Sequence, residues 1–257
     1  MSNQNFDYGN LNIPKIKKIF SQTSAVKVSN LFSKELCKQA YEYITDDEQN
    51  IIQKFSNDNR GLVVEEVNNI PLIKYFDKPF QINFQIFNKF LNSKLFDLSR
   101  ELLEEDVYLD RAEIHSRFAL GTSIPPHQDN AYFGLKNGKS LTFYISLNKQ
   151  NPLNGGLRYY KVPTGTTYNH KASDKPGFSL TLSENNYKKL DLFDPIYESG
   201  DCSIHHSTSI HFADSVPLKS KRVIVLRFAI HSIKDSVKDG HEKWYKEMVE
   251  MNRNTLR

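Results

Sequence analysis

Residues 141–147, Leu-Thr-Phe-Tyr-Ile-Ser-Leu, are dominated by aromatic, β-branched and other apolar side chains, which indicates a buried β-strand. Similar runs follow one another from about residue 106 and are separated by turns that contain Gly and Pro. The other runs are residues 107–118, 157–162, 202–205 and 223–231. Short strands at this density predict a mainly β core over residues 106–232, built as a sandwich or barrel.

The part that precedes this core, residues 26–105, is predicted to be mostly helical. A first helix should begin after Ser33, a suitable N-cap, and end near residues 46–47, because apolar side chains recur every four residues between them. A second helix is predicted from a stripe at spacings of three and four without Gly or Pro. That stripe consists of Phe84, Phe87, Leu91, Leu95, Leu98 and Leu102. Residues 61–67, between the two helices, should form a strand.

Three further segments complete the expected organisation. Residues 1–25 are polar and irregular enough to predict an N-terminal arm, apart from an apolar and basic patch at residues 13–20. Residues 164–199 are polar and are expected to form a structured insertion or lid in the β core. Residues 239–251 are predicted to be a C-terminal helix. The length of 257 residues is compatible with one domain.

The composition argues against two kinds of partner, nucleic acids and membranes. The 34 Lys and Arg residues are scattered among 30 Asp and Glu residues, so no concentrated basic surface for a nucleic acid is predicted. No apolar run approaches the length that a membrane span requires, and the first residues lack the apolar core of a signal peptide. The two cysteines, Cys37 and Cys202, are not in a Cys-x-x-Cys pair, which favours a reducing compartment. We therefore expect a cytoplasmic protein with neither a nucleic acid nor a membrane as partner.

The sequence His127-Gln128-Asp129 is the first candidate for chemistry. In an extended segment, residues i and i+2 point to the same side, so an imidazole and a carboxylate can bind one ion. About one His-x-acid pair is expected by chance in a chain of this composition, so the motif needs a partner elsewhere. Four of the eight histidines (His115, His170, His231 and His241) have no partner at an informative spacing and are expected to be surface or packed residues.

A second cluster supplies that partner. His205, His206 and His211 lie close together in the sequence, and Arg222 follows His211 by eleven residues. Two histidines and one carboxylate are the ligands of non-haem Fe(II) oxygenases, which leave coordination positions open for a 2-oxo acid and for dioxygen. The far carboxylate of that 2-oxo acid needs a cationic group, and Arg222 begins a predicted strand where it could serve.

These motifs resemble those of the phytanoyl-CoA dioxygenase family, and the resemblance covers most of the chain. It is carried by residues 126–129, by the strand at 141–147, by Asn154-Gly-Gly-Leu157, by Gly200-Asp201 and by His211 with Arg222. The resemblance implies a double-stranded β-helix, a jelly roll with helices packed on one sheet. It implies that His127, Asp129 and His211 bind iron and that Arg222 holds the distal carboxylate of 2-oxoglutarate.

The sequence departs from this family in two places. The family commonly has a serine two residues after the distal histidine, where this chain has Ala213, and Ser215 is the candidate to replace it. Lys221 lies beside Arg222, and a shift of one residue along a strand reverses which side chain faces the interior. The resemblance favours His211 over His205 and His206 as the third ligand, because only His211 has the family's spacing to the arginine.

Other residues are candidates for contact with the ligands. Thr142, Tyr144 and Arg117 lie on strands beside the predicted site and could contact the co-substrate or the substrate. Arg117, Arg158 and Lys161 suggest an anionic small-molecule substrate. Its specificity would depend on loops at residues 131–140 and 164–199.

The sequence thus predicts an Fe(II)- and 2-oxoglutarate-dependent dioxygenase that uses O2, hydroxylates a C–H bond and releases succinate and CO2. Asp129 argues against halogenation, because halogenating relatives replace that carboxylate to make room for chloride. One alternative is a Zn-dependent hydrolase on the same ligands, which would need neither O2 nor 2-oxoglutarate. The other is a jelly-roll binding module without catalysis.

Overall fold

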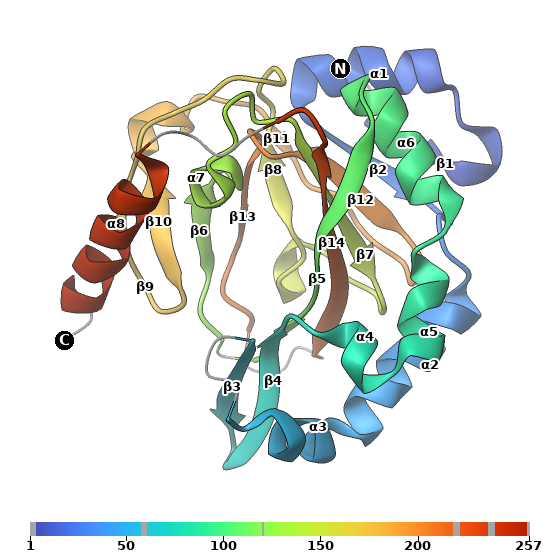
Figure 1. Ribbon diagram of the computed structural model, residues 1–257, viewed down its shortest axis with the longest axis vertical. Coiled ribbons are helices and arrows are strands. Elements are labelled where there is room, and N and C mark those ends of the chain that lie inside the picture. Colours follow the sequence, from blue (N-terminus) through green and yellow to red (C-terminus); the bar gives the residue numbers. More distant parts are fainter. Residues whose placement is uncertain (1–3, 58–60, 120, 218–221, 236–239, 256–257) are drawn as a thin grey trace.

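The computed structural model describes residues 4–57, 61–119, 121–217, 222–235 and 240–255. Within these residues, two sheets face one another and helices cover the outer side of the larger sheet (Figure 1). The larger sheet has the strand order β1-β2-β12-β7-β14-β5-β4-β3, and the smaller sheet has the order β11-β8-β13-β6. A hairpin of β9 and β10 lies beside the smaller sheet. The mainly β class with helices on one sheet is therefore as predicted.

The bounds of the elements are as follows. The strands are β1 (Asn5–Asp7), β2 (Ala25–Ser29), β3 (Leu62–Val67), β4 (Ile70–Phe76), β5 (Val107–Arg117), β6 (Ile124–His127), β7 (Ser140–Ser146), β8 (Arg158–Tyr160), β9 (His170–Lys175), β10 (Phe178–Leu182), β11 (Leu192–Phe193), β12 (Cys202–His206), β13 (Ile210–Ala213) and β14 (Val223–Ser232). The α-helices are α1 (Ile13–Thr23), α2 (Lys34–Asp46), α3 (Glu48–Phe55), α4 (Pro79–Ile82), α5 (Phe84–Phe87), α6 (Ser93–Leu103), α7 (Asn130–Phe133) and α8 (His241–Thr255). Short 3-10 helices are η1 (Tyr8–Asn10), η2 (Asn88–Phe90), η3 (Pro152–Asn154) and η4 (Glu184–Asn186).

The main core lies between the larger sheet and the helices. Alternate residues of β14 point into it, as expected for a strand whose successive side chains face opposite sides. These residues are Ile224, Leu226, Phe228 and Ile230, each fully buried. They pack with buried side chains of α1, α2 and α6, including Ile16, Ala40 and Leu95. The opposite face of the same strand is turned towards the smaller sheet.

The first predicted helix is confirmed, and the second is wrong as a single helix. The Ser33 hydroxyl accepts a hydrogen bond from the Leu36 N–H at the start of α2, which ends at Asp46 as expected. The predicted helix at residues 84–102 is divided into α5, η2 and α6. Asn92 has an extended backbone (φ −101°, ψ 171°) and caps α6 by accepting from the Lys94 N–H. The side chain of Asn92 therefore starts a new helix within the apolar stripe, and the spacing of the apolar residues gives no sign of it.

The N-terminal segment contains regular elements that the sequence did not predict. Residues 1–25 were expected to be an irregular arm, but β1 pairs with β2 and the apolar and basic patch forms the amphipathic helix α1. The predicted strand at residues 61–67 is confirmed as β3, and the unpredicted strands β2 and β4 also extend the larger sheet into the part predicted to be mostly helical. The sheet is thus built from both halves of the chain.

The remaining segments follow the predictions more closely. The region predicted as an insertion, residues 164–199, contains the β9–β10 hairpin, and its strand β11 pairs with β8 of the smaller sheet. Helix α8 corresponds to the predicted C-terminal helix, whose first residue, Asp239, lies outside the described residues. In the described part of the chain, no helix is both long and apolar enough to cross a membrane.

Candidate metal centre

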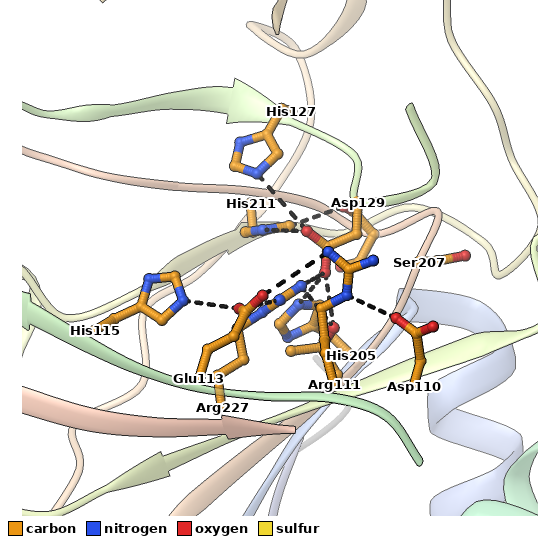
Figure 2. Close-up of polar contacts among 12 residues, drawn as sticks. Asp110, Arg111, Glu113, His115, His127, Asp129, His205, Ser207, His211 and Arg227 are labelled. Atoms are coloured by element: carbon orange, nitrogen blue, oxygen red, sulfur yellow. Dashed lines mark hydrogen bonds and ion pairs between the residues drawn. The ribbon is translucent and has the colours of Figure 1, made fainter. Parts of the chain in front are cut away.

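The two sequence motifs meet where two strands of the smaller sheet pair. Strand β6 ends at His127, and its antiparallel partner β13 places His211 directly opposite. The chain turns after β6, so that Asp129 stands at the N-cap of helix α7 and its carboxylate points back at the two imidazoles (Figure 2). Residues 84 positions apart in the sequence are therefore brought together by the strand register.

Three ligand atoms converge here. One atom from each of His127, Asp129 and His211 lies within 4.8 Å of the other two, and the three side chains are buried. Asp129 Oδ1 is 3.8 Å from His127 Nε2 and 3.6 Å from His211 Nε2. Two imidazole nitrogens and one carboxylate oxygen on one side of a central point match the donor set of non-haem Fe(II) sites. The residues present therefore fit the metal that the sequence predicts.

Backbone carbonyls orient both imidazoles. His127 Nδ1–H can donate to the Pro125 carbonyl at 2.8 Å, and His211 Nδ1–H can donate to the Ser209 carbonyl at 3.1 Å. This tautomer leaves Nε2 unprotonated on both rings, which is the state that binds a metal. In both cases the accepting carbonyl belongs to the residue two positions before the histidine.

The second oxygen of Asp129 is held by two donors. Thr142 Oγ1–H donates to Asp129 Oδ2 at 2.7 Å, and Arg227 Nη2 donates to the same oxygen at 2.8 Å. Arg227 also donates to Glu113 Oε2 at 2.5 Å, so its guanidinium lies between two carboxylates (Figure 2). Oδ1 is thereby left to face His127 and His211. Arg227 was not among the residues predicted from the sequence, although it is a charged residue within a run of apolar strand residues.

Burial and charge set the protonation states. Burial lowers the pKa of His127 to about 3 and that of His211 to about 4, so both are neutral near pH 7. Burial alone would raise the pKa of Asp129, but the Arg227 guanidinium and the nearby imidazoles hold it well below its ordinary value. Burial also opposes ionisation of Glu113, yet Arg227 helps to lower its pKa to about 2. Two neutral imidazoles and one carboxylate are thus ready to bind a cation.

His205 and His206 differ sharply in position because they are neighbours on a strand. His205 faces the site: its ring centroid is 4.6 Å from that of His211, and its Nε2 is 3.4 Å from Asp129 Oδ2. Its Nδ1 lies 3.1 Å from the Tyr159 hydroxyl. His206 points to the other face, towards Phe20 and Thr208. His205 therefore adjoins the carboxylate oxygen that does not face the two other imidazoles.

Thr142 and Tyr144 both face the interior between the sheets. Thr142 contacts the carboxylate of Asp129, as described above. Tyr144 is 7% exposed, and its hydroxyl donates to Gln150 Oε1 at 2.7 Å. Their predicted contact with the co-substrate remains a prediction.

The structure contradicts the predicted role of Arg222. Its guanidinium makes a bidentate ion pair with Glu48 of α3, at 2.7 and 2.6 Å, on the helix-covered side of the larger sheet. It also donates to the Ser116 hydroxyl at 3.0 Å. Because strand side chains alternate, Arg222 shares the side of Ile224 and turns away from the metal ligands. Lys221, the alternative of the sequence analysis, lies outside the described residues.

The proposed replacement for the missing serine is also not brought to the site. Ser215 is exposed, two residues beyond the end of β13, whereas the residue at the family position, Ala213, is buried. The four histidines expected to be surface or packed residues have varied surroundings. Among them, His170 Nε2 accepts from the Gln128 N–H at 3.0 Å and so contacts the turn that carries the ligands.

Comparison with known proteins adds an independent line of evidence. The chain is 25% identical over 196 residues to the probable alpha-ketoglutarate-dependent hypophosphite dioxygenase of Stutzerimonas stutzeri. The aligned residues cover 72% of this chain and 67% of that protein. The chain matches no protein-family model.

Three solved structures have a similar fold. AviO1 from Streptomyces viridochromogenes has a TM-score of 0.67 at 10% identity, covering 89% of this chain and 99% of that chain. The non-heme alpha ketoglutarate dependent epimerase SnoN from nogalamycin biosynthesis has a TM-score of 0.65 at 12% identity, covering 88% and 85%. EctD from S. alaskensis, solved with bound Fe, has a TM-score of 0.66 at 13% identity, covering 86% and 77%. The chain therefore shares the fold of these three proteins, and the predicted jelly roll is confirmed.

Proposed function

We propose that this protein is a non-haem Fe(II)- and 2-oxoglutarate-dependent dioxygenase that hydroxylates a small-molecule substrate. The observation that carries the proposal is the convergence of His127, Asp129 and His211 within 4.8 Å, in protonation states that bind a metal. The likeness to the Stutzerimonas stutzeri protein supports the same activity. The overall reaction consumes O2 and 2-oxoglutarate and yields succinate, CO2 and the hydroxylated product.

The chain itself supplies binding and orientation. A bound Fe(II) supplies the oxygen chemistry, with coordination positions left open for the 2-oxo acid and O2. Thr142 and Arg227 fix the Asp129 carboxylate so that one oxygen is directed at the metal position. The carbonyls of Pro125 and Ser209 hold the two imidazoles. Burial of all three ligands excludes bulk water from this side of the site.

We also propose membership of the phytanoyl-CoA dioxygenase family and a cytoplasmic location. The family proposal rests on the motifs at residues 126–129 and 154–157 together with the jelly-roll fold. The location rests on Cys37 and Cys202, which are buried and unpaired, as thiols are in a reducing compartment.

Anaerobic titration tests the activity. Fe(II) and 2-oxoglutarate added together should produce the weak visible absorption band of the chelate, and admission of O2 should then give succinate. His211→Ala should lose the band, whereas the matched variant His206→Ala, on the opposite face of β12, should keep it. A wild-type protein that binds metal but gives neither band nor succinate would reject the oxygenase. Hydrolysis supported by Zn²⁺ without O2 would favour the metallohydrolase instead.

A further inference from the structure

Arg117 is a buried cation that lacks a buried anion. It is the last residue of β5 and is 7% exposed. Its Nη2 donates to the Asp214 carbonyl at 2.8 Å, but its Nε is buried without a hydrogen-bond partner. Within the part of the chain that the structure describes, no carboxylate lies at ion-pair distance. A buried charge is costly unless it is paired, so this guanidinium calls for an anion that none of the described residues supplies.

The acidic side chains near Arg117 are already paired. The charges of Glu65 and Asp214 favour its ionised form, while burial lowers its pKa. Glu65 is 2.9 Å from the Lys74 ammonium, and the Asp214 carboxylate is 2.6 Å from Arg158. Neither acid therefore neutralises Arg117 directly.

Arg117 faces the same side of the larger sheet as the metal ligands. The preceding residue, Ser116, accepts a hydrogen bond from Arg222 on the helix-covered side. Alternation then directs Arg117 to the opposite face, where its partner across β14 is Val223. Val223 belongs to the buried cluster between the two sheets that also contains Tyr144.

The position of Arg117 along the site matches the length of 2-oxoglutarate. The carbonyl that holds it belongs to Asp214, three residues after His211, which is roughly 10 Å along an extended chain. A five-carbon chain about 5 Å long, with a coordination bond of about 2 Å and a hydrogen bond of about 3 Å, spans a similar distance. Ala213, the last residue of β13, separates the strand's His211 from Asp214 and has only a small side chain.

We propose that Arg117 binds the distal carboxylate of 2-oxoglutarate. The inference rests on the proposed oxygenase function and gives the role once expected of Arg222 to a different strand. Gly155 contributes, because a Cβ there would lie 3.2 Å from Arg117 Nε and 2.7 Å from Val216. With φ at +90°, this glycine lets its loop approach the guanidinium closely. Guanidinium binds a carboxylate bidentately, which fixes the orientation of the co-substrate.

Arg227 of β14 faces the same interior as Arg117, but its guanidinium is already engaged. Arg227 donates to both Asp129 and Glu113, which oppose it on two sides. Displacing either carboxylate would disturb the metal ligand or leave Glu113 buried and unpaired. Arg227 therefore positions the metal ligand, and Arg117 remains available for the co-substrate.

The test compares two 2-oxo acids on the Fe(II) protein without O2, with the affinity read from the chelate band. 2-Oxopentanoate has the same chain length as 2-oxoglutarate but lacks the distal carboxylate. Wild type should bind 2-oxoglutarate about 10- to 100-fold more tightly than 2-oxopentanoate. Arg117→Gln should remove this preference by weakening 2-oxoglutarate alone, and Arg117→Lys should restore part of it. The matched variant Arg222→Gln should keep the wild-type preference.

Each outcome has a distinct meaning. Loss of the preference in Arg222→Gln but not in Arg117→Gln would overturn the assignment. Equal affinity of wild type for the two acids would also overturn it, while leaving the oxygenase intact, and this arm needs no variant to fold. Absence of a chelate band with either acid would instead reject the oxygenase function. Fe(II) binding and thermal unfolding of each variant establish that any loss is confined to the 2-oxo acid.

Discussion

The two faces of β14 bury side chains of opposite character. The helix-covered face presents four apolar side chains and ends in the closed ion pair of Arg222 with Glu48. The face towards the smaller sheet carries Arg227 and His231 among small apolar residues. Arg227 holds the proposed ligand Asp129 there, whereas Arg222, just before the strand, attaches helix α3 to the sheet. We therefore expect these two arginines, five positions apart, to affect the metal site and the stability of the fold differently.

The two faces of β14 should therefore affect different measurable properties, the free energy of unfolding and the affinity for the metal. Substitutions on the helix-covered face should change the free energy of unfolding and spare the metal. Substitutions on the opposite face should change metal affinity, whatever their effect on stability. The following variants test that division.

The largest effect on stability is expected from Phe228→Ala. Phe228 is fully buried in the main core and stacks with Phe80, with ring centroids 6.3 Å apart. Its truncation should lower the free energy of unfolding by about 3 to 5 kcal/mol, measured by urea titration. The folded variant should still bind one metal ion, and loss of metal binding with unchanged stability would break the comparison.

Glu48→Gln should have the next largest effect. The variant leaves Arg222 partly buried without its carboxylate, which should cost about 2 to 4 kcal/mol of unfolding free energy. Metal affinity should be unchanged, because the pair lies on the helix-covered side. Calorimetric metal titration alongside urea unfolding gives both quantities, and a large drop in metal affinity would contradict the assignment of the two faces.

Arg227→Met should weaken metal binding and also lower stability, because it leaves Asp129 and Glu113 buried without their shared guanidinium. Removing the donor that holds Asp129 Oδ2 should weaken metal binding by about 10- to 100-fold. Arg227→Lys should lose less, because it keeps the charge between Asp129 and Glu113. Calorimetry with Fe(II) under anaerobic conditions measures the change, and wild-type affinity in Arg227→Met would show that Thr142 alone positions the carboxylate.

The smallest effect is expected when the metal-free protein is taken from pH 7 to pH 6. The pKa values of His127 and His211 are lowered by burial to about 3 and about 4, whereas an unfolded chain protonates histidine near pH 6.5. Stability present above pH 6.5 should therefore be lost progressively as the pH falls towards 4. The two histidines together should lower the free energy of unfolding by about 1.4 kcal/mol between pH 7 and pH 6, measured by urea unfolding with a chelator present. A flat profile over this range would contradict the buried, neutral state of these imidazoles.

Much of the β core was predictable because its signals are local. Strands such as β5, β7 and β14 consist of apolar, β-branched and aromatic runs, which can be recognised without knowing which strands they pair with. Strand β6 was missed, because Ile-Pro-Pro-His carries two prolines and too few strand-forming residues. The convergence of His127 with His211 was inferred from motif resemblance, since their pairing depends on a register between distant strands.

The role of arginines was not predictable by spacing alone. Arg222 has the expected separation from His211, but its side chain lies on the wrong face of the sheet. Arg227 and Arg117 lie on the face towards the smaller sheet, where only the strand pairing reveals their neighbours. Because neighbouring residues of a strand face opposite sides, an arginine at the expected spacing can still point away from the site.

The most direct measurement is the stoichiometry of metal binding in a matched pair of histidine variants. Anaerobic calorimetry with Fe(II) should give one ion per chain for wild type and for His206→Ala, which alters the face turned away from the site. His211→Ala should lose this binding while remaining folded. Retention of tight, one-to-one binding in His211→Ala, or its loss in His206→Ala alone, would contradict the account.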